Sequence, residues 1–436
     1  MRIHFVGIGG IGVSALARHF IAEGWDVSGS DLKKSEITDD LEDEGVRIQI
    51  GHDKNNIDSG IEKIVYTAAV NFDNPEIKEA IKLGIETESY PQALAEVSKD
   101  YFTIAISGTH GKSTTTAMTA MIFIEAGLDP TVIVGTKLLQ FGSKNYRRGD
   151  SEYLIIEADE WNKSILNYSP DLATITNLEL EHLDSYSDID DLVETFQEYL
   201  SGLKDKPVIL NDDDSNLKRL KVKNGHFFSV NSPEKEEIKK ALKIPGDHNL
   251  ENASAAYKTA ELLKIPKEKI LRGIANYKGI WRRFEEKEIT VSGQKINIVQ
   301  DYAHHPTELR ATLKALSDKY GEKAVAVFQP HQYKRTAHLR DQFIKVLKES
   351  EIKVFVVDIY SVAGRESEEI KKKISSRELV EGVKNEKVDY LPGGFGEIKK
   401  KLEEYLQRGK IIAIIGAGDI YQLEEVLKGQ IKSKNK

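Results

Sequence analysis

A short apolar stretch, a glycine- and threonine-rich loop and a long helical pattern follow one another between residues 102 and 126. Residues 102–106 are typical of a buried strand, and the loop continues as Gly108-Thr109-His110-Gly111-Lys112-Ser113-Thr114. Glycines let a backbone wrap closely around an anion, and the first turn of a helix directs free N–H groups toward it. Because a strand, a phosphate loop and a helix in this order occur in parallel sheets, the loop predicts an α/β fold around a phosphate site.

The loop differs from the commonest phosphate-binding motif, because Ile106 stands where its first glycine is expected. The remaining residues still supply the required groups. Lys112 can neutralise the terminal phosphates of ATP, and Ser113 offers a hydroxyl to Mg²⁺. A turn without a ligand is the alternative interpretation. The expected ATP-binding loop residues are Gly108, Thr109, His110, Gly111, Lys112, Ser113 and Thr114.

Acidic residues follow two predicted strands downstream of this loop. Glu157-Ala158-Asp159-Glu160 comes directly after the strand at 153–156, and Glu181-His182-Leu183-Asp184 comes shortly after the strand at 172–176. Mg²⁺ prefers oxygen ligands, and parallel sheets gather ligand-binding residues at the carboxyl ends of their strands. Either cluster alone is typical of a solvated turn. Together, downstream of a phosphate loop, they predict a metal site.

Another glycine-rich turn lies near the N-terminus. The strand at 3–6 leads into Gly7-Ile8-Gly9-Gly10-Ile11-Gly12 and a helical pattern, and the strand at 26–30 ends at Asp31. Such a turn presents N–H groups to a diphosphate, and an acid after the next strand can bond a ribose hydroxyl. A tight turn without a ligand is the alternative. The expected contacts of a bound nucleotide here are Gly9, Gly10, Ile11, Gly12 and Asp31.

Strands and helices alternate along all 436 residues, which are too many for one ordinary domain. A boundary is indicated near residues 98–100, and an arginine-bearing polar stretch at 277–285 precedes a charged strand pair at 286–291 and 295–299. We therefore expect three consecutive α/β domains, over 1–98, 99–284 and 285–436. In the third domain the predicted strands lie at 324–328, 354–357 and 411–415, with a helix at 337–348.

Composition excludes several classes of protein. The formal net charge is -8, so no overall basic field attracts nucleic acid or anionic membrane. The absence of cysteine excludes disulfides, thiolate metal sites and cysteine nucleophiles. No apolar run approaches the roughly 20 residues that span a bilayer, and the N-terminus lacks the pattern of a secretory signal. We expect a cytoplasmic monomer or homodimer that acts on small molecules, without nucleic-acid or membrane partners.

Three further polar segments are candidates for ligand contacts. His248, Asn249 and Asn252 stand at a predicted helix start, where the two asparagines share a face and can contact a heterocycle. A helix-capping role explains Asn249 equally well. Arg282-Arg283-Phe284 offers guanidinium groups suited to phosphate, or to a surface ion pair.

Two more loops follow strands of the third segment. Asp301-Tyr302-Ala303-His304-His305-Pro306-Thr307-Glu308 follows the first, and Phe328-Gln329-Pro330-His331-Gln332-Tyr333-Lys334-Arg335 follows the next. Their histidines and arginine suit a substrate carboxylate. A metal at His304 and His305 is the alternative, although adjacent residues in one loop rarely face one ion.

Taken in order, these motifs resemble those of the Mur ligase family, from the first glycine turn to Gly416-Ala417-Gly418-Asp419, and so over nearly the whole chain. The resemblance implies a Rossmann-like domain for a UDP-sugar, a central phosphate-loop ATPase domain and a Rossmann-like C-terminal domain for an amino acid. It also implies that the first glycine turn holds a UDP diphosphate and not a nicotinamide cofactor.

The implied activity is that of an ATP-dependent ligase with ATP and Mg²⁺ as cofactors. It joins L-alanine to the carboxylate of UDP-N-acetylmuramate through an acyl phosphate, in cytoplasmic peptidoglycan precursor synthesis, and so serves cell-wall biogenesis, cell shape and cell division. The implied catalytic residues are Lys112, His182, Arg283, His304 and Arg335. The implied metal ligands are Ser113, Glu157 and His182. The implied nucleotide contacts outside the loop are His248, Asn249, Asn252, Arg283 and Asp301.

Some positions depart from the family's pattern. Gln332 stands where many relatives carry an arginine that helps to bind the amino acid, and Trp161-Asn162 replaces the commoner Ser-Asp beside the sugar acid. Residues 195–199 contain no lysine, whereas ligases for later amino acids use a carbamylated one there. The absence of this lysine agrees with a ligase that adds alanine. Because of Gln332, a Mur-type ligase that attaches a recycled tripeptide to UDP-N-acetylmuramate is the nearest alternative. An NAD-dependent dehydrogenase and a non-enzymatic nucleotide-binding regulator are alternatives from other classes.

Overall fold

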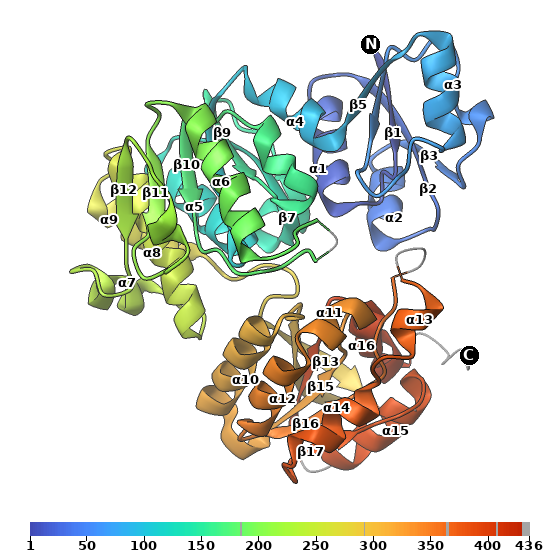
Figure 1. Ribbon diagram of the computed structural model, residues 1–436, viewed down its shortest axis with the longest axis vertical. Helices are drawn as coiled ribbons and strands as arrows, with labels where there is room; N and C mark the ends of the chain where they lie inside the picture. The colour runs from blue at the N-terminus through green and yellow to red at the C-terminus, as the bar shows by residue number, and fades with distance from the viewer. Residues whose placement is uncertain (184, 292, 363–365, 407–408, 430–436) are drawn as a thin grey trace. The chain divides into compact units, whose positions relative to one another are not determined.

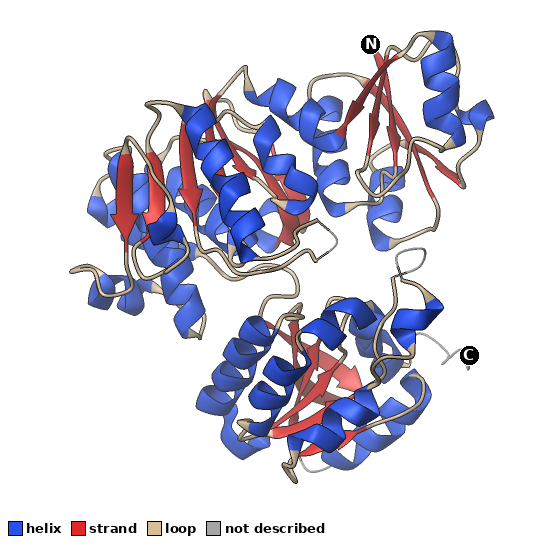
Figure 2. Cartoon of the chain, viewed as in Figure 1, coloured by secondary structure: helices blue, strands red, loops and turns tan. Residues whose placement is uncertain are grey.

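The computed structural model describes residues 1–183, 185–291, 293–362, 366–406 and 409–429. These residues form three β-sheets in succession along the chain, each accompanied by helices (Figures 1 and 2). They divide into two compact units. The first comprises Met1–Lys243 and Asn249–Lys278, and the second comprises Ile244–His248 and Gly279–Lys436. The predicted α/β class with three successive sheets is confirmed.

The first sheet has the strand order β3-β2-β1-β4-β5 with every neighbouring pair parallel. The order reverses between β1 and β4, and α/β sheets bind ligands beyond the carboxyl ends of the strands at such a point. The strands are β1 (Arg2–Val6), β2 (Asp26–Asp31), β3 (Arg47–Ile50), β4 (Lys63–Tyr66) and β5 (Glu86–Ser89). The helices are α1 (Ile11–Ala22), α2 (Glu36–Asp43), α3 (Pro75–Leu83) and α4 (Tyr90–Ser98).

The second sheet, in the order β12-β11-β10-β6-β9-β7-β8, is parallel except for the hairpin of β7 and β8 at one edge. The apolar strand predicted before the phosphate loop is its central strand, β6. The strands are β6 (Phe102–Ser107), β7 (Thr131–Leu138), β8 (Lys144–Arg147), β9 (Tyr153–Glu157), β10 (Leu172–Ile175), β11 (Val208–Asn211) and β12 (Gly225–Phe228). The helices are α5 (Lys112–Ala126), α6 (Ile189–Leu203), α7 (Lys235–Ala241), α8 (Asp247–Leu262) and α9 (Lys267–Asn276).

The third sheet has the order β13-β14-β18-β15-β16-β17, in which the charged strand pair forms the antiparallel edge hairpin β13–β14. The strands are β13 (Glu285–Val291), β14 (Gln294–Asp301), β15 (Ala324–Phe328), β16 (Lys353–Val356), β17 (Val388–Tyr390) and β18 (Ile411–Ile415). The helices are α10 (Pro306–Tyr320), α11 (Tyr333–His338), α12 (Arg340–Lys348), α13 (Glu368–Lys371), α14 (Ser376–Val383), α15 (Phe395–Leu406) and α16 (Leu423–Lys428).

The helix predicted over 337–348 is wrong as a single element. The structure has two helices there, α11 and α12, which meet at Leu339 with φ -98° and ψ 16°. Within α11 the Thr336 hydroxyl donates to the carbonyl of Gln332 at 2.8 Å, and such back-bonding bends helices. The bend places α11 directly after the loop that ends strand β15.

Local sequence explains where the helices next to the candidate loops begin and end. Helix α5 starts after Gly111 and stops at Gly127, both with left-handed backbone that favours glycine. Helix α10 starts after His305 with Pro306 in its first turn, and Glu308 completes a capping box with His305. These caps fix the orientation of both loops with respect to the sheets.

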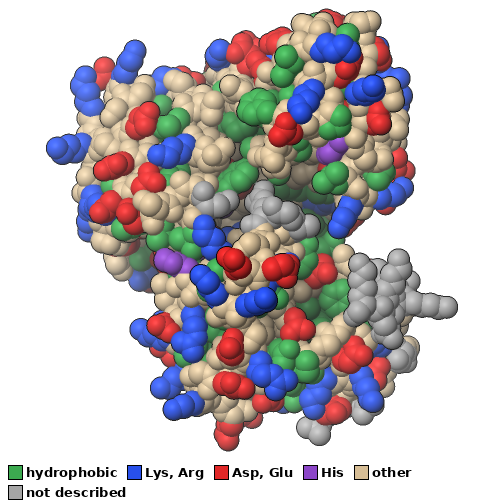
Figure 3. Space-filling model, turned by 45° about the vertical axis from the view of Figure 1, so that its right-hand side comes forward, with side chains coloured by type: hydrophobic (Ala, Val, Ile, Leu, Met, Phe, Trp, Pro, Cys, Tyr) green, Lys and Arg blue, Asp and Glu red, His purple; other side chains and the backbone are tan. Residues whose placement is uncertain are grey.

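The core consists of apolar strands covered by amphipathic helices. In the second unit one cluster includes Leu313 of α10 and Phe343 of α12, and another includes Leu402 of α15 and Leu423 of α16. The surface in Figure 3 carries acidic and basic side chains intermixed. Among the helices of the described ranges, none has both the length and the apolarity needed to cross a membrane.

Candidate active site

The phosphate loop between β6 and α5 depends on two glycines. Gly108 has φ +118° and Gly111 has φ +83°, a region that side chains disfavour. A Cβ at Gly108 would lie 2.3 Å from Thr176 Oγ1, and one at Gly111 would lie 2.1 Å from Asn252 Oδ1. Both positions therefore require glycine for space as well as for conformation.

Residues that follow strand β10 hold the loop in place. The Asn177 side chain accepts from the His110 N–H at 2.8 Å and donates to the His110 carbonyl at 3.0 Å. The Thr176 hydroxyl also donates to that carbonyl, at 2.6 Å, and the Thr109 hydroxyl donates to the Glu179 carbonyl at 2.9 Å. This support was not predicted from the sequence. The pattern that could have indicated it is the pair of polar residues, Thr176 and Asn177, directly after β10, the strand that lies next to β6.

Lys112 is buried and already paired. Its ammonium donates to the carbonyls of Gly108 and Thr109, at 2.7 and 3.2 Å, and to the Glu160 carboxylate at 2.8 Å. Asp159 lies 3.9 Å away. Burial acts to lower the pKa of Lys112, but the surrounding carboxylates outweigh it and raise the pKa. The lysine is therefore a fixed positive charge beneath the loop.

Glu157 at the end of β9 is the first of the carboxylates around this charge. It accepts from the Gly135 N–H at 2.9 Å and from the Ser113 hydroxyl. Burial raises the pKa of Glu157, and the Lys112 ammonium opposes that effect. The structure thus brings together Ser113 and Glu157, two of the three predicted metal ligands.

His182, the third predicted ligand, lies in a neighbouring cluster. Its Nε2 is 3.6 Å from Glu160 Oε1, and the ligand atoms of Asp159, Glu160 and His182 lie within 4.8 Å of one another. Burial raises the pKa of Glu160 to about 7, although Lys112 acts in the opposite direction. Three acids thus share one ammonium, and an added divalent cation would relieve their repulsion. Asp184 of the predicted acidic run lies outside the described residues.

The glycine turn after β1 makes an internal contact that the sequence did not reveal. Asp31 accepts from the Gly9 N–H at 2.9 Å, so one carboxylate oxygen holds the turn itself. Gly10 lies just before the first turn of α1, which begins at Ile11. A Cβ at Gly12 would lie 3.0 Å from the Tyr90 ring. The predicted diphosphate contacts therefore form one tightly packed strand-to-helix turn in which Asp31 positions the loop.

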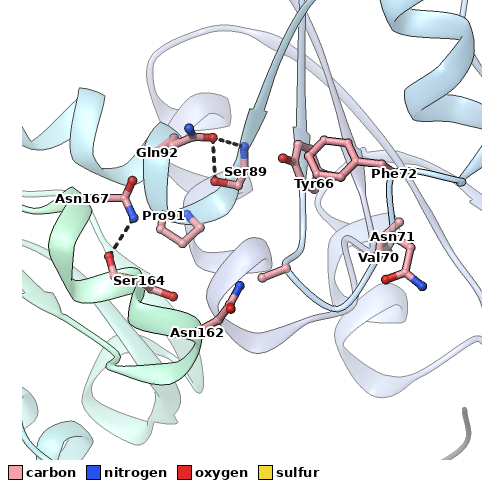
Figure 4. Close-up of a pocket in the computed structure, with 11 residues that line it drawn as sticks. Tyr66, Val70, Asn71, Phe72, Ser89, Pro91, Gln92, Asn162, Ser164 and Asn167 are labelled. Carbon is pink, nitrogen blue, oxygen red and sulfur yellow. Dashed lines mark hydrogen bonds between the residues drawn. The ribbon is translucent and has the colours of Figure 1, made fainter. Parts of the chain in front are cut away.

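A pocket of about 430 Å³ lies in the first unit, beyond the carboxyl end of β4 (Figure 4). Tyr66 and Phe72 contribute aromatic faces, with ring centroids 5.8 Å apart. Gln92 of α4 and Asn162 contribute amide groups. A lining of aromatic and polar side chains suits a polar ring such as a sugar. Asn162, singled out in the sequence because it departs from the family's pattern, is part of this wall.

In the second unit, the partly exposed Arg283 and the buried Asp301 lie in one network. Arg283 donates to Glu308 at 2.8 Å, and this carboxylate outweighs burial and raises the pKa of the guanidinium. Asp301 accepts from the backbone N–H groups of Phe284 and Ala303, at 2.7 and 2.8 Å. Burial raises the pKa of Asp301, with Arg283 opposing it. Asp301 therefore anchors the segment that carries Arg283.

His304 and Arg335 meet at His331. His304 Nδ1 lies 3.1 Å from Glu308, its ring centroid is 6.0 Å from that of His331, and Arg335 lies 3.1 Å from His331 Nδ1. The structure thus gathers these predicted residues at the carboxyl ends of β14 and β15. His305 points elsewhere and caps α10 by accepting from the Thr307 N–H at 3.3 Å.

The remaining candidates lie at the start of α8. His248 is partly buried, and its burial together with Arg283 lowers its pKa to about 4. The capping role considered for Asn249 is wrong, because α8 begins at Asp247 and Asn249 lies inside its first turn. Asn252 Oδ1 lies 3.4 Å from the Thr115 hydroxyl, directly beneath the phosphate loop.

A phosphate loop on the central strand of a parallel sheet, with carboxylates gathered around its lysine, defines a nucleotide-binding α/β protein. Three family models match in succession: "Mur ligase family, catalytic domain" over residues 2–102, "Mur ligase middle domain" over 106–260 and "Mur ligase, glutamate ligase domain" over 282–418. The chain belongs to the Mur ligase family.

Similar proteins cover the full chain. The UDP-N-acetylmuramate--L-alanine ligase of Acetivibrio thermocellus is 37% identical, over 98% of this chain and 95% of its own. The UDP-N-acetylmuramate-alanine ligase MurC of Thermotoga maritima has a solved structure that matches with a TM-score of 0.80 and 26% identity, covering 99% of both chains. A murein peptide ligase of Psychrobacter arcticus shares the fold, with a TM-score of 0.72, 22% identity and 99% coverage of both chains.

Proposed function

We propose that this protein is an ATP-dependent ligase that joins L-alanine to the carboxylate of UDP-N-acetylmuramate, in cytoplasmic peptidoglycan precursor synthesis. The observation that carries the proposal is the buried Lys112–Glu160 pair beneath a glycine loop, in a chain similar over its full length to ligases of that name. The proposed domains are residues 1–98, 99–284 and 285–436.

The proposed reaction has two steps. A carboxylate resists attack by an amine, so one carboxylate oxygen of the sugar acid first takes the γ-phosphoryl group of ATP and ADP leaves. The neutral amine nitrogen of L-alanine then attacks the carbonyl carbon of the acyl phosphate, the C–O bond to phosphate breaks, and the nitrogen loses one proton and keeps the other as the amide N–H. Phosphoryl transfer of this kind depends mainly on positioning and on stabilisation of charge.

The central sheet supplies the groups for ATP. We assign the terminal phosphates to the N–H groups of the loop and to Lys112, which would exchange its contact with Glu160 for phosphate oxygens. Ser113 and Glu157 are an oxygen donor pair that fits Mg²⁺, and His182 with Asp159 fits a second cation. Bound Mg²⁺ would neutralise part of the charge on the phosphates.

The first sheet supplies the site for the UDP-sugar. We assign the diphosphate to the N–H groups of Gly10, Ile11 and Gly12, and the sugar to the pocket beyond β4. The position of the glycine turn at the point where the strand order reverses supports this assignment. The amides of Gln92 and Asn162 are suited to hydrogen bonds with sugar hydroxyls.

The second unit supplies the groups for the amino acid. We assign the alanine carboxylate to Arg335 and the vicinity of the new bond to His304, which share the contact with His331. Arg283, His248 and Asp301 are proposed nucleotide contacts, together with Asn249 and Asn252. The backbone of Gln332, with φ +67° and its N–H donating to Tyr360 at 2.8 Å, shapes the loop beside Arg335.

A phosphate-release assay tests the proposal. Purified protein is incubated with ATP, Mg²⁺ and UDP-N-acetylmuramate, and with L-alanine, glycine, L-serine or the recycled tripeptide as the amine substrate. We expect turnover to be fastest with L-alanine, and the amide product to be identified by mass spectrometry. Turnover with tripeptide alone would replace this function by the recycling ligase. Tight binding of NAD, or ATP binding without turnover of any acceptor, would overturn the ligase assignment.

A further inference from the structure

The hairpin of β7 and β8 packs beside α1 in the first unit (Figure 1). Its two strands pair Ile133 with Tyr146 and Leu138 with Lys144, and the register is irregular between Ile133 and Leu138. Asn145 lies opposite this irregular stretch and is fully buried, at 0% exposure. A buried amide needs partners for its donors and its acceptor, so its contacts show what it holds.

Asn145 bonds the beginning of α1. Its amide nitrogen donates to the carbonyl of Ile11 at 2.5 Å and to the Ser14 hydroxyl at 2.8 Å. Its carbonyl oxygen accepts from Arg18 at 2.5 Å, and the Arg18 guanidinium also binds Glu44. Ile11 and Ser14 belong to the first turn of α1, and Ile11 is also part of the glycine turn. Asn145 therefore fixes the direction in which the N–H groups of that turn point.

The other strand of the hairpin, β7, contacts Glu157 at the candidate metal site beside the phosphate loop. Gly135, in the irregular stretch of β7, donates its N–H to Glu157 at 2.9 Å, and a Cβ there would lie 2.8 Å from the carboxylate. Ser113 of the phosphate loop donates to the same carboxylate. A shift of Glu157 would therefore displace Gly135, and with it the stretch that faces Asn145.

Ion pairs fasten the hairpin to the first sheet's helices. Lys137 donates to Glu36 and Asp40, at 2.7 Å each, and Lys144 lies 3.3 Å from Glu44. Glu36, Asp40 and Glu44 follow one another every four residues and so share one face at α2. The hairpin is thus held to α2 by charge and to α1 by the Asn145 amide.

We propose that Asn145 is a positioning residue through which the β7–β8 hairpin couples binding at the glycine turn of α1 to binding at Glu157. The inference rests on the proposed function, which places the UDP-sugar at the glycine turn and Mg·ATP at Glu157. Occupation of one site tightens the other, and linkage makes the effect reciprocal. Asn145 touches neither substrate and acts through the first turn of α1.

The test uses the full chain and the variant Asn145→Asp. The substitution keeps the shape and the acceptor for Arg18 but removes both donors and places a carboxylate against the Ile11 carbonyl. Calorimetry gives the dissociation constant of UDP-N-acetylmuramate without and with Mg²⁺ and β,γ-imido-ATP. For the wild-type protein we expect the analogue to tighten binding about fivefold or more, a typical size for coupling. The coupling ratio is the dissociation constant of UDP-N-acetylmuramate without the analogue divided by that with it, and for Asn145→Asp we expect a ratio near one. Relative to the wild-type protein, we also expect about tenfold higher KM for UDP-N-acetylmuramate and a kcat within about threefold.

Two further variants separate coupling from general damage. Lys137→Met removes the two ion pairs of Lys137 with α2 but leaves the contacts of the hairpin with α1, and it should preserve the coupling ratio. Ser14→Ala removes a single acceptor and should lower the ratio partly, which keeps the test decisive if Asn145→Asp fails to fold. If the coupling ratio is unchanged in both Asn145→Asp and Ser14→Ala while the wild-type protein ligates normally, the inference about Asn145 is overturned but the proposed function stands. Wild-type protein that binds no UDP-sugar overturns the proposed function as well.

Discussion

The Lys112 ammonium lies 2.8 Å from the Glu160 carboxylate, and both groups are buried beneath the phosphate loop. In the absence of a ligand, the positive charge that phosphates require is therefore neutralised by an ion pair with Glu160. A phosphate that takes over the ammonium leaves Glu160 without its partner, in surroundings that already raise the pKa of this carboxyl to about 7. Under the proposed function, binding of ATP would therefore be linked to the charge on Glu160.

Lys112→Met should lower kcat/KM by roughly 10²–10³ or more, because the charge that stabilises the transferring phosphoryl group is lost. It should also destabilise the fold, by about 1–3 kcal/mol, because Glu160 becomes a buried carboxyl without its cation. Phosphate release and thermal unfolding measure the two effects. The double variant Lys112→Met/Glu160→Gln should recover stability but not activity. Turnover by the single variant above a tenth of the wild-type rate would contradict the assignment of Lys112.

Gly111→Ala should abolish nucleotide binding, because the new Cβ would occupy the place of the Asn252 side chain, 2.1 Å away. Gly127 provides a matched control: its φ of +81° is similar to that of Gly111, but no atom lies within 4 Å of a Cβ there. Gly127→Ala should cost only the backbone strain of a left-handed alanine, about 1 kcal/mol, and retain ligation. Binding of a fluorescent ATP analogue and urea unfolding distinguish the two variants. Equal behaviour would show that the close contact with Asn252 is unimportant.

Local patterns of apolar residues and glycine-rich loops in the sequence predicted many of the strands and loops of the fold. The runs of apolar residues at 324–328 and 411–415 coincide with β15 and β18, and the loop between β6 and α5 was placed correctly. The hairpin strand β8 was missed, because Lys144–Arg147 is a polar tetrapeptide without alternation. Asn145 in this strand is buried because α1 covers it. Local sequence patterns do not indicate contact with a helix that is so distant in the sequence.

The sequence predicted which residues form the candidate site but not which of them contact one another. The sequence indicated Lys112 and the acidic run at 157–160 separately, and the ion pair with Glu160 depends on β9 lying beside β6. Asp31 was expected to face a ribose, yet one of its oxygens holds the Gly9 N–H. Pairings of this kind follow from the strand order of a sheet, which the order of elements in the chain does not determine.

Glu157→Gln should raise the Mg²⁺ concentration required for half-maximal turnover by about tenfold or more, because a neutral amide binds a hard cation less tightly than a carboxylate. The amide oxygen can still accept from Gly135, so the fold should be retained. Steady-state rates across a Mg²⁺ titration, with the exposed Glu152→Gln as control, provide the measurement. An unchanged requirement for Mg²⁺ would remove Glu157 from the proposed metal ligands. A chelator should stop turnover in all of these proteins.

His4 in the first sheet should make stability depend on pH. Its ring is buried, with Nδ1 2.9 Å from the Ser28 hydroxyl and Nε2 3.9 Å from Glu76, and His52 lies close by. Burial lowers the pKa of His4 to about 4, from 6.5 in the unfolded chain. The unfolded chain therefore binds the extra proton first as pH falls below 6.5. The stability contributed by neutral His4 is complete above pH 6.5 and is lost toward pH 4, by roughly 3 kcal/mol.

Urea unfolding between pH 4 and 7.5, followed by the fluorescence of Trp25, measures this dependence. In His4→Gln the curve should be flatter over the window from pH 6.5 to 4, while the partly exposed His226→Gln should retain the wild-type slope. A wild-type slope in His4→Gln would show that His4 does not govern the acid sensitivity of this region.

The place that a Cβ would take at Gly111 is filled by the amide of Asn252, which comes from α8. For protein engineering, the consequence is that residues 108–114 are not a portable module. Grafted alone into another parallel sheet, the loop would have a hole on its underside where the amide stood, and the glycine would be free to adopt other conformations. A working transplant has to include a second helix that presents an asparagine at the same place, so the smallest transferable unit is the loop together with α8.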